Sequence, residues 1–389
     1  MEGAAVKFLH TADWQLGKPF ARIPDPDKRR RLQQARLDGL ERLAAIARRA
    51  EARFILVAGD LFDSPSPARS LVSATFHAIG AMRLPVVAIP GNHDFGGPGG
   101  PWEQAFVQQE MAALAPNFSI LTEERPLVLD EAVILPAPLR QRHVAHDPTG
   151  WIGRACDALP ADRPWIVLAH GSVQGFGSAD EEQGATTYNR LDLSRLPDGQ
   201  IDYIALGDWH GLKSIDPRIW YSGTPEIDGF PKGEGHRPGH ALLVEVARGV
   251  APQVEAVATG AIRWERIGFH FDAESSLAQL ERLFDDRLGS GAEGALLHLD
   301  LSGQLSIGER LALEQRLATW EARLIWLRVN DQVRETPSED EIERLTQRAD
   351  DPLTARVARR LLAETASADA EIAAIARLAL RELYQAANA

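Results

Sequence analysis

The chain has 389 residues, 44% of them hydrophobic, and a formal net charge of −13 at pH 7. This length suggests two or three domains of roughly 150 residues each, and the acidic charge argues against a protein held on nucleic acid by bulk positive charge. No apolar run approaches the roughly 20 residues that span a bilayer, so we expect no membrane segment. Because the sequence has one cysteine and no secretory signal is recognisable in residues 1–10, we expect a cytoplasmic protein.

The first half of the chain alternates short apolar runs with amphipathic stretches. The runs at 5–9, 54–57 and 85–90 are typical of buried strands, and apolar residues recur at helical spacing over 28–50 and 68–82. This alternation favours a doubly wound α/β sheet with right-handed crossovers. The pattern predicts one more helix at 102–114 and further strands at 118–121, 126–129, 132–135, 165–169, 201–206 and 240–246. Residues 171–190 are polar and glycine-rich, and we expect a loop there.

The pattern changes after residue 247 and predicts a smaller α/β region followed by helices. We expect strands at 253–258, 262–270, 295–299 and 324–329, and helices at 275–287, 308–319, 338–347, 352–364 and 368–386. We therefore divide the chain into an α/β domain at 1–250, an α/β cap at 251–335 and a helical C-terminal region at 336–389. In the last predicted helix, an apolar stripe at helical spacing either packs on the cap or docks on a partner. The stripe consists of Ile372, Ile375, Ala379 and Leu383.

Side chains with oxygen or nitrogen ligand atoms follow five of the predicted strands. They are Asp13, Gln15, Asp60, Asn92, His93, His170, Asp208 and His210. Ligand sites of parallel sheets lie at the carboxyl ends of the strands, so we expect these side chains to converge. One such residue alone is usually a cap or a structural histidine, but five junctions of this kind indicate a metal site. Mixed oxygen and imidazole ligands suit manganese, iron or zinc more than calcium.

The blocks that contain these residues resemble those of the calcineurin-like metallophosphoesterase superfamily. The blocks are Gly59-Asp60, Gly91-Asn92-His93-Asp94 and His170-Gly171. Three further runs, at 10–17, 59–63 and 221–225, resemble the SbcD-type DNA repair nucleases, and the resemblance covers about residues 6–246. It implies a β-sandwich flanked by helices and a centre of two divalent ions. Two metals about 3.5–4 Å apart can clamp the attacking and leaving oxygens of a phosphoryl displacement.

The resemblance also implies a role for each residue. Asp60 would bridge the two metals. The first metal site would be completed by Asp13, Gln15 and His210, and the second by Asn92, His170 and Asp208. His93 would be the acid that protonates the leaving group, with Asp94 behind it as a supporting partner.

Two ligand positions depart from the family pattern, which has histidine at both Gln15 and Asp208. More oxygen and less nitrogen shift the preference toward harder ions. We therefore expect Mn²⁺ foremost, with Mg²⁺, Fe²⁺ and Zn²⁺ as the alternatives, and a first metal that is held loosely.

Three functions are consistent with this interpretation. The first is a metal-dependent DNA nuclease, exonuclease or endonuclease, that acts in DNA repair with an SMC-like ATPase of the SbcC type, by analogy as a homodimer. In nucleases of this type the cap helps to place DNA, and C-terminal helices hold the coiled coil of the ATPase. The second is a small-molecule phosphodiesterase or phosphatase on the same metal centre. The third is a weakly active scaffold subunit whose altered ligands leave little catalysis.

Overall fold

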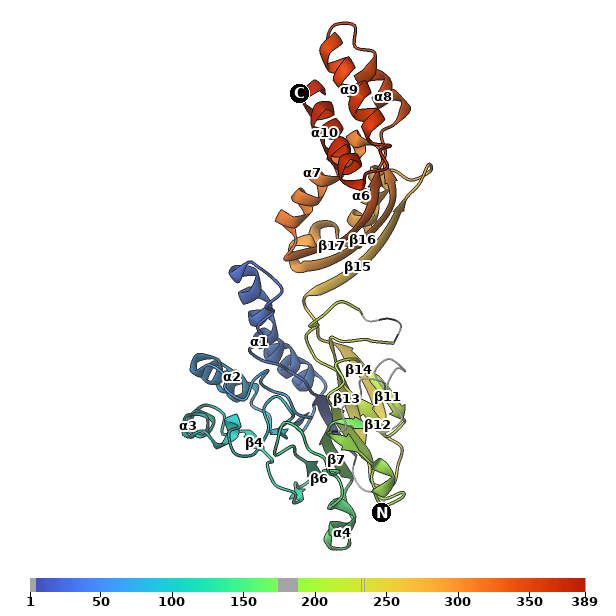
Figure 1. Ribbon diagram of the computed structural model, residues 1–389. Helices are drawn as coiled ribbons and strands as arrows, with labels where there is room; N and C mark the ends of the chain where they lie inside the picture. The colour runs from blue at the N-terminus through green and yellow to red at the C-terminus, as the bar shows by residue number, and fades with distance from the viewer. Residues whose placement is uncertain (1–4, 174–187, 232, 234, 389) are drawn as a thin grey trace. The chain divides into compact units, whose positions relative to one another are not determined.

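The computed structural model describes residues 5–173, 188–231, 233 and 235–388. The chain divides into two compact units, Met1–Arg263 and Trp264–Ala389 (Figure 1). The predicted boundary between the cap and the helical C-terminal region falls inside the second unit. No helix among the described residues is long and apolar enough to cross a bilayer.

The first unit is built on two six-stranded sheets. The first sheet has the order β14-β13-β1-β2-β3-β4. Its strands are β14 (Gln253–Ala258), β13 (His240–Val246), β1 (Val6–Thr11), β2 (Ile55–Val57), β3 (Val86–Ala88) and β4 (Phe118–Ile120). The strands β1 to β4 are parallel to one another, and β13 and β14 extend the sheet in antiparallel fashion.

The second sheet has the order β11-β12-β10-β7-β6-β5. Its strands are β11 (Lys213–Asp216), β12 (Ile219–Tyr221), β10 (Tyr203–Gly207), β7 (Trp165–His170), β6 (Val133–Ala137) and β5 (Leu127–Val128). The four central strands are parallel, and both edge strands are antiparallel. At the two ends of the loop predicted over 171–190, β8 (Ser172–Val173) pairs in parallel with β9 (Arg190–Leu191), and residues 174–187 lie outside the described residues.

The two sheets form a sandwich because successive side chains of a strand point to opposite faces. Phe8 and Leu56 of the first sheet share a buried cluster with Leu168 and Ala205 of the second, and this cluster is the core between the sheets. Neighbouring positions such as Leu9 instead pack outward against helices. These helices are α1 (Pro26–Arg49), α2 (Arg69–Met82) and α3 (Ala105–Leu114), preceded by the 3-10 turn η1 (Pro101–Glu103).

A third cluster covers the outer face of the second sheet. There, Trp151 and Ile152 pack on β6, β7 and β10, around the short helix α4 (Ile152–Ala155) and the 3-10 turns η2 (Cys156–Ala158) and η3 (Leu193–Arg195). The β-sandwich flanked by helices is therefore confirmed. The alternation of strands and helices predicted for the first strands is observed as the parallel strands β1 to β4, and the chain then crosses to a second sheet instead of extending the first.

The second unit is a three-stranded sheet covered by two helices. The sheet has the order β15-β16-β17, with β15 (Arg263–Phe271), β16 (Ala295–Leu305) and β17 (Trp326–Glu335). The covering helices are α6 (Leu277–Arg287), followed by the 3-10 segment η4 (Gly289–Gly294), and α7 (Ile307–Arg323). Their core stacks Phe284 of α6 on Trp320 of α7, with ring centroids 4.2 Å apart and planes 2° apart. This packing explains why the sequence alternates between strand and helix periods here.

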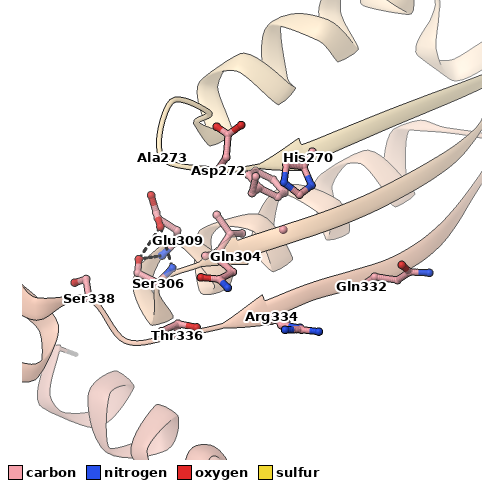
Figure 2. A pocket seen from close by; sticks show the side chains of 13 residues that line it. His270, Asp272, Ala273, Gln304, Ser306, Glu309, Gln332, Arg334, Thr336 and Ser338 are labelled. Atoms are coloured by element: carbon pink, nitrogen blue, oxygen red, sulfur yellow. Dashed lines mark hydrogen bonds between the residues drawn. The ribbon is translucent and has the colours of Figure 1, made fainter.

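A polar groove of about 740 Å³ lies where this sheet meets the start of α7. Figure 2 shows Ser306 hydrogen-bonded to Glu309, the capping pair of that helix, with Arg334 and then Gln332 farther away along β17. Because acidic and basic side chains both line the groove, its charge does not select one class of ligand.

Three helices follow in sequence, α8 (Glu339–Thr346), α9 (Pro352–Glu364) and α10 (Ala370–Asn388), and they pack together in Figure 1. The buried face of α10 carries Ala376 and Leu380. In the predicted stripe, Ala379 and Leu383 are half-buried, but Ile372 and Ile375 are 46% and 60% exposed. The stripe is therefore split, and only its second half packs on the chain's own helices.

Candidate metal centre

The carboxyl ends of five strands from the two sheets meet at one place. β1, β2 and β3 are adjacent parallel strands of the first sheet, and β7 and β10 are adjacent parallel strands of the second. The loops after these strands carry all the predicted ligands. Asp60 follows β2, His170 ends β7, and His170 Nε2 lies 3.7 Å from Asp60 Oδ1. Side chains more than a hundred positions apart in sequence therefore converge on one centre.

The backbone at this centre is strained. Asp13, Gln15, Asp60 and Asp208 adopt left-handed conformations, with φ values of 51°, 47°, 55° and 98°. Residues with side chains rarely adopt this region, and such strain tends to be retained at functional sites. Gly91 contributes in another way, since a Cβ there would lie 2.1 Å from Asp60 Oδ1. The unusual backbone geometry of these loops thus serves to bring the carboxylates together.

Asp60 is the hub of the centre and is buried. Its Oδ2 accepts a hydrogen bond from Gln15 Nε2 at 2.7 Å, and its Oδ1 accepts one from the backbone N–H of His93 at 2.9 Å. His170 also faces Oδ1. The two oxygens of Asp60 therefore contact different groups, Gln15 at Oδ2, and the His93 backbone and His170 at Oδ1.

One set of side chains gathers around His170, which is fully buried. Its Nδ1–H donates to the carbonyl of Ala58 at 2.8 Å, which directs Nε2 into the centre. Nε2 lies 3.0 Å from Asn92 Oδ1 and 3.7 Å from Asp208 Oδ1. A backbone carbonyl on the far ring nitrogen is the usual way in which a protein orients a metal-binding histidine.

The other set gathers around Asp13, whose carboxylate is buried and accepts hydrogen bonds from the backbone N–H of Asp208. His210 Nε2 lies 4.0 Å from Asp13 Oδ1. On its other side, His210 Nδ1 contacts Asp228 Oδ2 at 2.8 Å, and Lys18 Nζ contacts the same oxygen at 2.8 Å. Asp228 therefore orients His210 toward Asp13. Asp228 was not predicted as a site residue, because it stands outside the motifs, three residues after the run at 221–225.

The buried side chain of Arg36 supports the Asp13 loop through hydrogen bonds to its backbone. This residue was not predicted from the sequence either. Arg36 of α1 donates to the carbonyls of Trp14, Asp13 and Glu226 and to Thr224 Oγ1, at 2.8–3.2 Å. Thr224 Oγ1 in turn donates to the Asp13 carbonyl at 2.8 Å. The turn at 221–225, noted only for its resemblance, thus holds the loop of a predicted ligand. Arg36 itself is hidden in sequence because it stands within an ordinary amphipathic helix.

His93 and Asp94 occupy different surroundings. His93 Nδ1 contacts the carbonyl of Asp63 at 3.0 Å, so its Nε2 is the ring nitrogen that remains for proton transfer. The buried Asp94 carboxylate accepts hydrogen bonds from the backbone N–H groups of Gly91, Leu61 and Phe62, at 2.8–3.2 Å. The bonds of Asp94 therefore tie the Asp60 loop to the Asn92 loop. Among the described residues, the hydrogen-bond partner of the His93 ring is the carbonyl of Asp63.

The negatively charged carboxylates at the centre repel one another. Burial, together with the nearby carboxylates of Asp60 and Asp208, raises the pKa of Asp13 to about 6 despite the opposing effect of His210 and His170. Burial and the charge of Asp60 raise the pKa of Asp94 to about 7. Burial alone would lower the pKa of His170, but the carboxylates around it raise that pKa to about 9. The centre thus favours added positive charge.

These side chains fit a divalent cation. One ligand atom each from Asp13, Asp60 and His170 lies within 4.8 Å of the other two. Gln15 Oε1 is buried and has no hydrogen-bond partner among the described residues, which leaves an amide oxygen free for a cation. Asn92 and Asp208 contact His170, and His210 lies 4.0 Å from Asp13, so the remaining predicted ligands surround this triad. The assignment of each residue to one metal or the other stays a prediction.

Comparison with known proteins gives the family. The family model described as calcineurin-like phosphoesterase matches residues 6–212, the segment that carries every predicted ligand. The chain belongs to the calcineurin-like phosphoesterase family. It is thus a hydrolase of a dinuclear, metal-dependent family, and the described residues contain a triad able to hold a metal.

Three solved structures illustrate what this calcineurin-like phosphoesterase is similar to. The protein TT1561 of Thermus thermophilus has 16% sequence identity, with 66% of this chain and 100% of that chain covered and a TM-score of 0.40. GAP50, the anchor in the inner membrane complex of Plasmodium, has 13% identity, coverages of 66% and 85%, and a TM-score of 0.38. A dimetal phosphatase from Danio rerio has 10% identity, coverages of 64% and 98%, and a TM-score of 0.34.

Proposed function

We propose that this phosphoesterase is a metal-dependent DNA nuclease that hydrolyses phosphodiester bonds. The observation that carries the proposal is the two-sided arrangement around Asp60, with His93 beside it. Two divalent ions bound there would polarise a phosphoryl group and lower the pKa of a bound water. Residues of the centre would hold and orient the ions, and we propose that His93 gives a proton from Nε2 to the leaving oxygen, since its Nδ1 contacts the Asp63 carbonyl.

Two features favour DNA over a small phosphoester as the substrate. The runs at 10–17 and 221–225 resemble SbcD-type nucleases, and a second compact unit, Trp264–Ala389, follows the phosphoesterase domain. A small substrate would not need that unit. In residues 264–389, however, acidic residues outnumber arginines and lysine does not occur. We therefore propose that the cap places DNA by shape and local contacts, because its bulk charge would repel phosphates.

An SMC-like ATPase is the partner that we propose for the C-terminal helices. The exposed apolar side chains of α10 support this, since Ile372, Ile375 and Leu378 follow one another at steps of three residues and are each 46–60% exposed. A helix of a coiled coil could cover such a row. Manganese is the ion that we propose for the cell, on account of Gln15 and Asp208.

The test is a Mn²⁺-dependent assay on linear duplex DNA and single-stranded DNA, with bis-para-nitrophenyl phosphate as a second substrate. We expect DNA degradation that His93→Ala and Asp60→Ala each abolish. Cleavage of the ester alone would favour a small-molecule phosphodiesterase. Cleavage of neither substrate would favour a scaffold subunit with little catalysis.

A further inference from the structure

We propose that the stacked side chains of His143 and Tyr188 form a platform on which a base of single-stranded DNA stacks beside the metal centre. The inference rests on the proposed function and adds a nucleotide-binding subsite to it. The two rings are 5.2 Å apart between centroids and 13° from parallel. His143 is exposed and Tyr188 is 43% exposed, so part of the stack is open to a ligand. Aromatic faces presented in this way are how proteins commonly bind unpaired bases.

The platform is held in place by Asn189, whose side chain is buried. Its backbone N–H donates to the Val144 carbonyl at 2.7 Å, and its Oδ1 accepts from the backbone N–H of Val144 at 2.8 Å. Its Nδ2 also donates to the Arg142 carbonyl at 3.0 Å. These three bonds lock the segments that carry His143 and Tyr188 against each other. A preordered stack loses little conformational entropy when a base binds.

The same asparagine connects the platform to the metal centre. The carbonyl of Asn189 accepts a hydrogen bond from the backbone N–H of Ser172 at 3.0 Å. Ser172 Oγ donates to Asp208 Oδ2 at 3.0 Å, and Ser172 lies two residues after His170. Two hydrogen bonds therefore separate the platform from a predicted metal ligand. We therefore propose that a nucleotide whose phosphate lies at the centre stacks a base on this platform.

The charge around the platform also suits a nucleotide. Arg140, Arg142 and Arg190 flank it in sequence and are exposed, and none of the three forms an ion pair with another residue in the described part of the chain. Each of these arginines can contact a phosphate of the bound strand, although the same stretches of sequence also carry acidic residues at 147, 180–182 and 192. Aromatic faces interleaved with arginines are typical of sites for single-stranded nucleic acid. Bases of intact duplex DNA are already stacked on their neighbours, so an unpaired strand is the ligand that the platform fits.

The test compares two fluorescent oligonucleotides of equal length with the purified full chain and no added metal, using fluorescence anisotropy. One is oligodeoxythymidylate, and the other carries abasic tetrahydrofuran residues in place of the bases. We expect the wild type to bind the base-bearing strand at least about fivefold more tightly. Tyr188→Ala should remove that preference, whereas Tyr188→Phe and Tyr188→Trp should keep it.

Two control variants separate stacking from other effects. Val250→Ala alters an exposed side chain elsewhere in the unit and should change neither affinity. Arg142→Ala should weaken both oligonucleotides alike, because a phosphate contact does not distinguish a base from its absence. Equal binding of the two strands by the wild type, or an unchanged preference in Tyr188→Ala, would overturn the platform.

Because the binding measurement involves no cleavage, its failure can be distinguished from failure of the proposed function. Loss of the base preference with DNA degradation intact would remove the platform and leave the nuclease. A base preference without any degradation of DNA would leave the platform and remove the nuclease.

Discussion

Gln15 stands at a predicted ligand position, where the resemblance implies histidine. Its Nε2 donates to Asp60 at 2.7 Å, and its Oε1 is a buried atom without a hydrogen-bond partner among the described residues. A neutral amide oxygen binds zinc more weakly than imidazole does. We therefore expect the metal on this side to be lost during purification. Metal analysis by mass spectrometry should find fewer than two ions per chain in the wild type and more zinc in Gln15→His. Two tightly bound zinc ions in the wild type would contradict this.

Arg36 should matter for both stability and metal binding. It satisfies three backbone carbonyls and one hydroxyl beneath Asp13, and each buried acceptor left unpaired costs roughly 1–3 kcal/mol. We expect Arg36→Met to lower the free energy of unfolding by about 3 kcal/mol or more and to weaken Mn²⁺ binding. Urea unfolding and calorimetric titration would measure the two effects. Arg49→Met on the exposed surface of the same helix is the matched control, and equal behaviour of the two variants would refute the role of Arg36.

Helix α10 separates two kinds of apolar side chain. Ile372, Ile375 and Leu378 are exposed, whereas Leu380 is 3% exposed in a core cluster. Changing the three exposed residues together to serine should alter the free energy of unfolding by about 0.5 kcal/mol or less per site. Leu380→Ala should cost about 2–5 kcal/mol. Urea unfolding of the two variants tests this, and a large loss in the triple variant would show that the row already packs within the chain.

At the level of elements, periodicity predicted most helices and strands correctly, because their apolar residues recur with a clear helical or strand period. The predicted helix 68–82 is observed at Arg69–Met82, and the predicted strand 253–258 at Gln253–Ala258. The stacking of two sheets did not follow from periodicity. A strand that is buried on both faces has the same apolar sequence pattern whether the strands form one sheet or two. The stacking followed from the family resemblance. Short elements such as α4 and β11 were missed because four residues hold too little pattern.

For the site, the motifs predicted which side chains converge. They did not predict the residues that hold these side chains in position. Asp60, His170 and Asp208 stand at strand ends, where topology alone brings them together. Asp228 and Arg36 act from a loop and from a helix interior, and their partners become visible only in three dimensions. Sequence likewise placed Asp94 next to His93, whereas its carboxylate binds backbone N–H groups.

Across the whole phosphoesterase domain, His10 links the two sheets. From β1 it contacts Tyr203 Oη at 3.0 Å and the Leu206 carbonyl of β10 at 3.2 Å. Burial lowers the pKa of His10 to about 3, although the bond to Leu206 opposes this effect. The unfolded chain therefore binds a proton at this residue more readily than the folded chain does. Its contribution to stability is complete above about pH 6.5 and is lost as the pH falls toward 3.

The expected result is a difference between the wild type and His10→Gln. Relative to the variant, the wild type should lose up to about 1.4 kcal/mol of unfolding free energy per pH unit below about pH 6.5. Urea unfolding at several pH values between neutral pH and the acid limit of the native state would measure it. Other groups with shifted pKa values, such as Asp94, are present in both proteins and cancel in the difference. Parallel pH profiles of the two proteins would show that His10 is not the group responsible.

We expect Asp60 to join the two sides of a metal centre that hydrolyses phosphoesters. The most direct measurement is the rate of bis-para-nitrophenyl phosphate hydrolysis with Mn²⁺ and after chelation, for the wild type and for Asp60→Asn. Asp130→Asn, at an exposed carboxylate, is the control. We predict that chelation and Asp60→Asn each lower the rate by about a hundredfold or more, a loss of at least about 2.7 kcal/mol in transition-state stabilisation, while Asp130→Asn has no effect. Hydrolysis that persists at the wild-type rate in Asp60→Asn or after chelation would contradict the account.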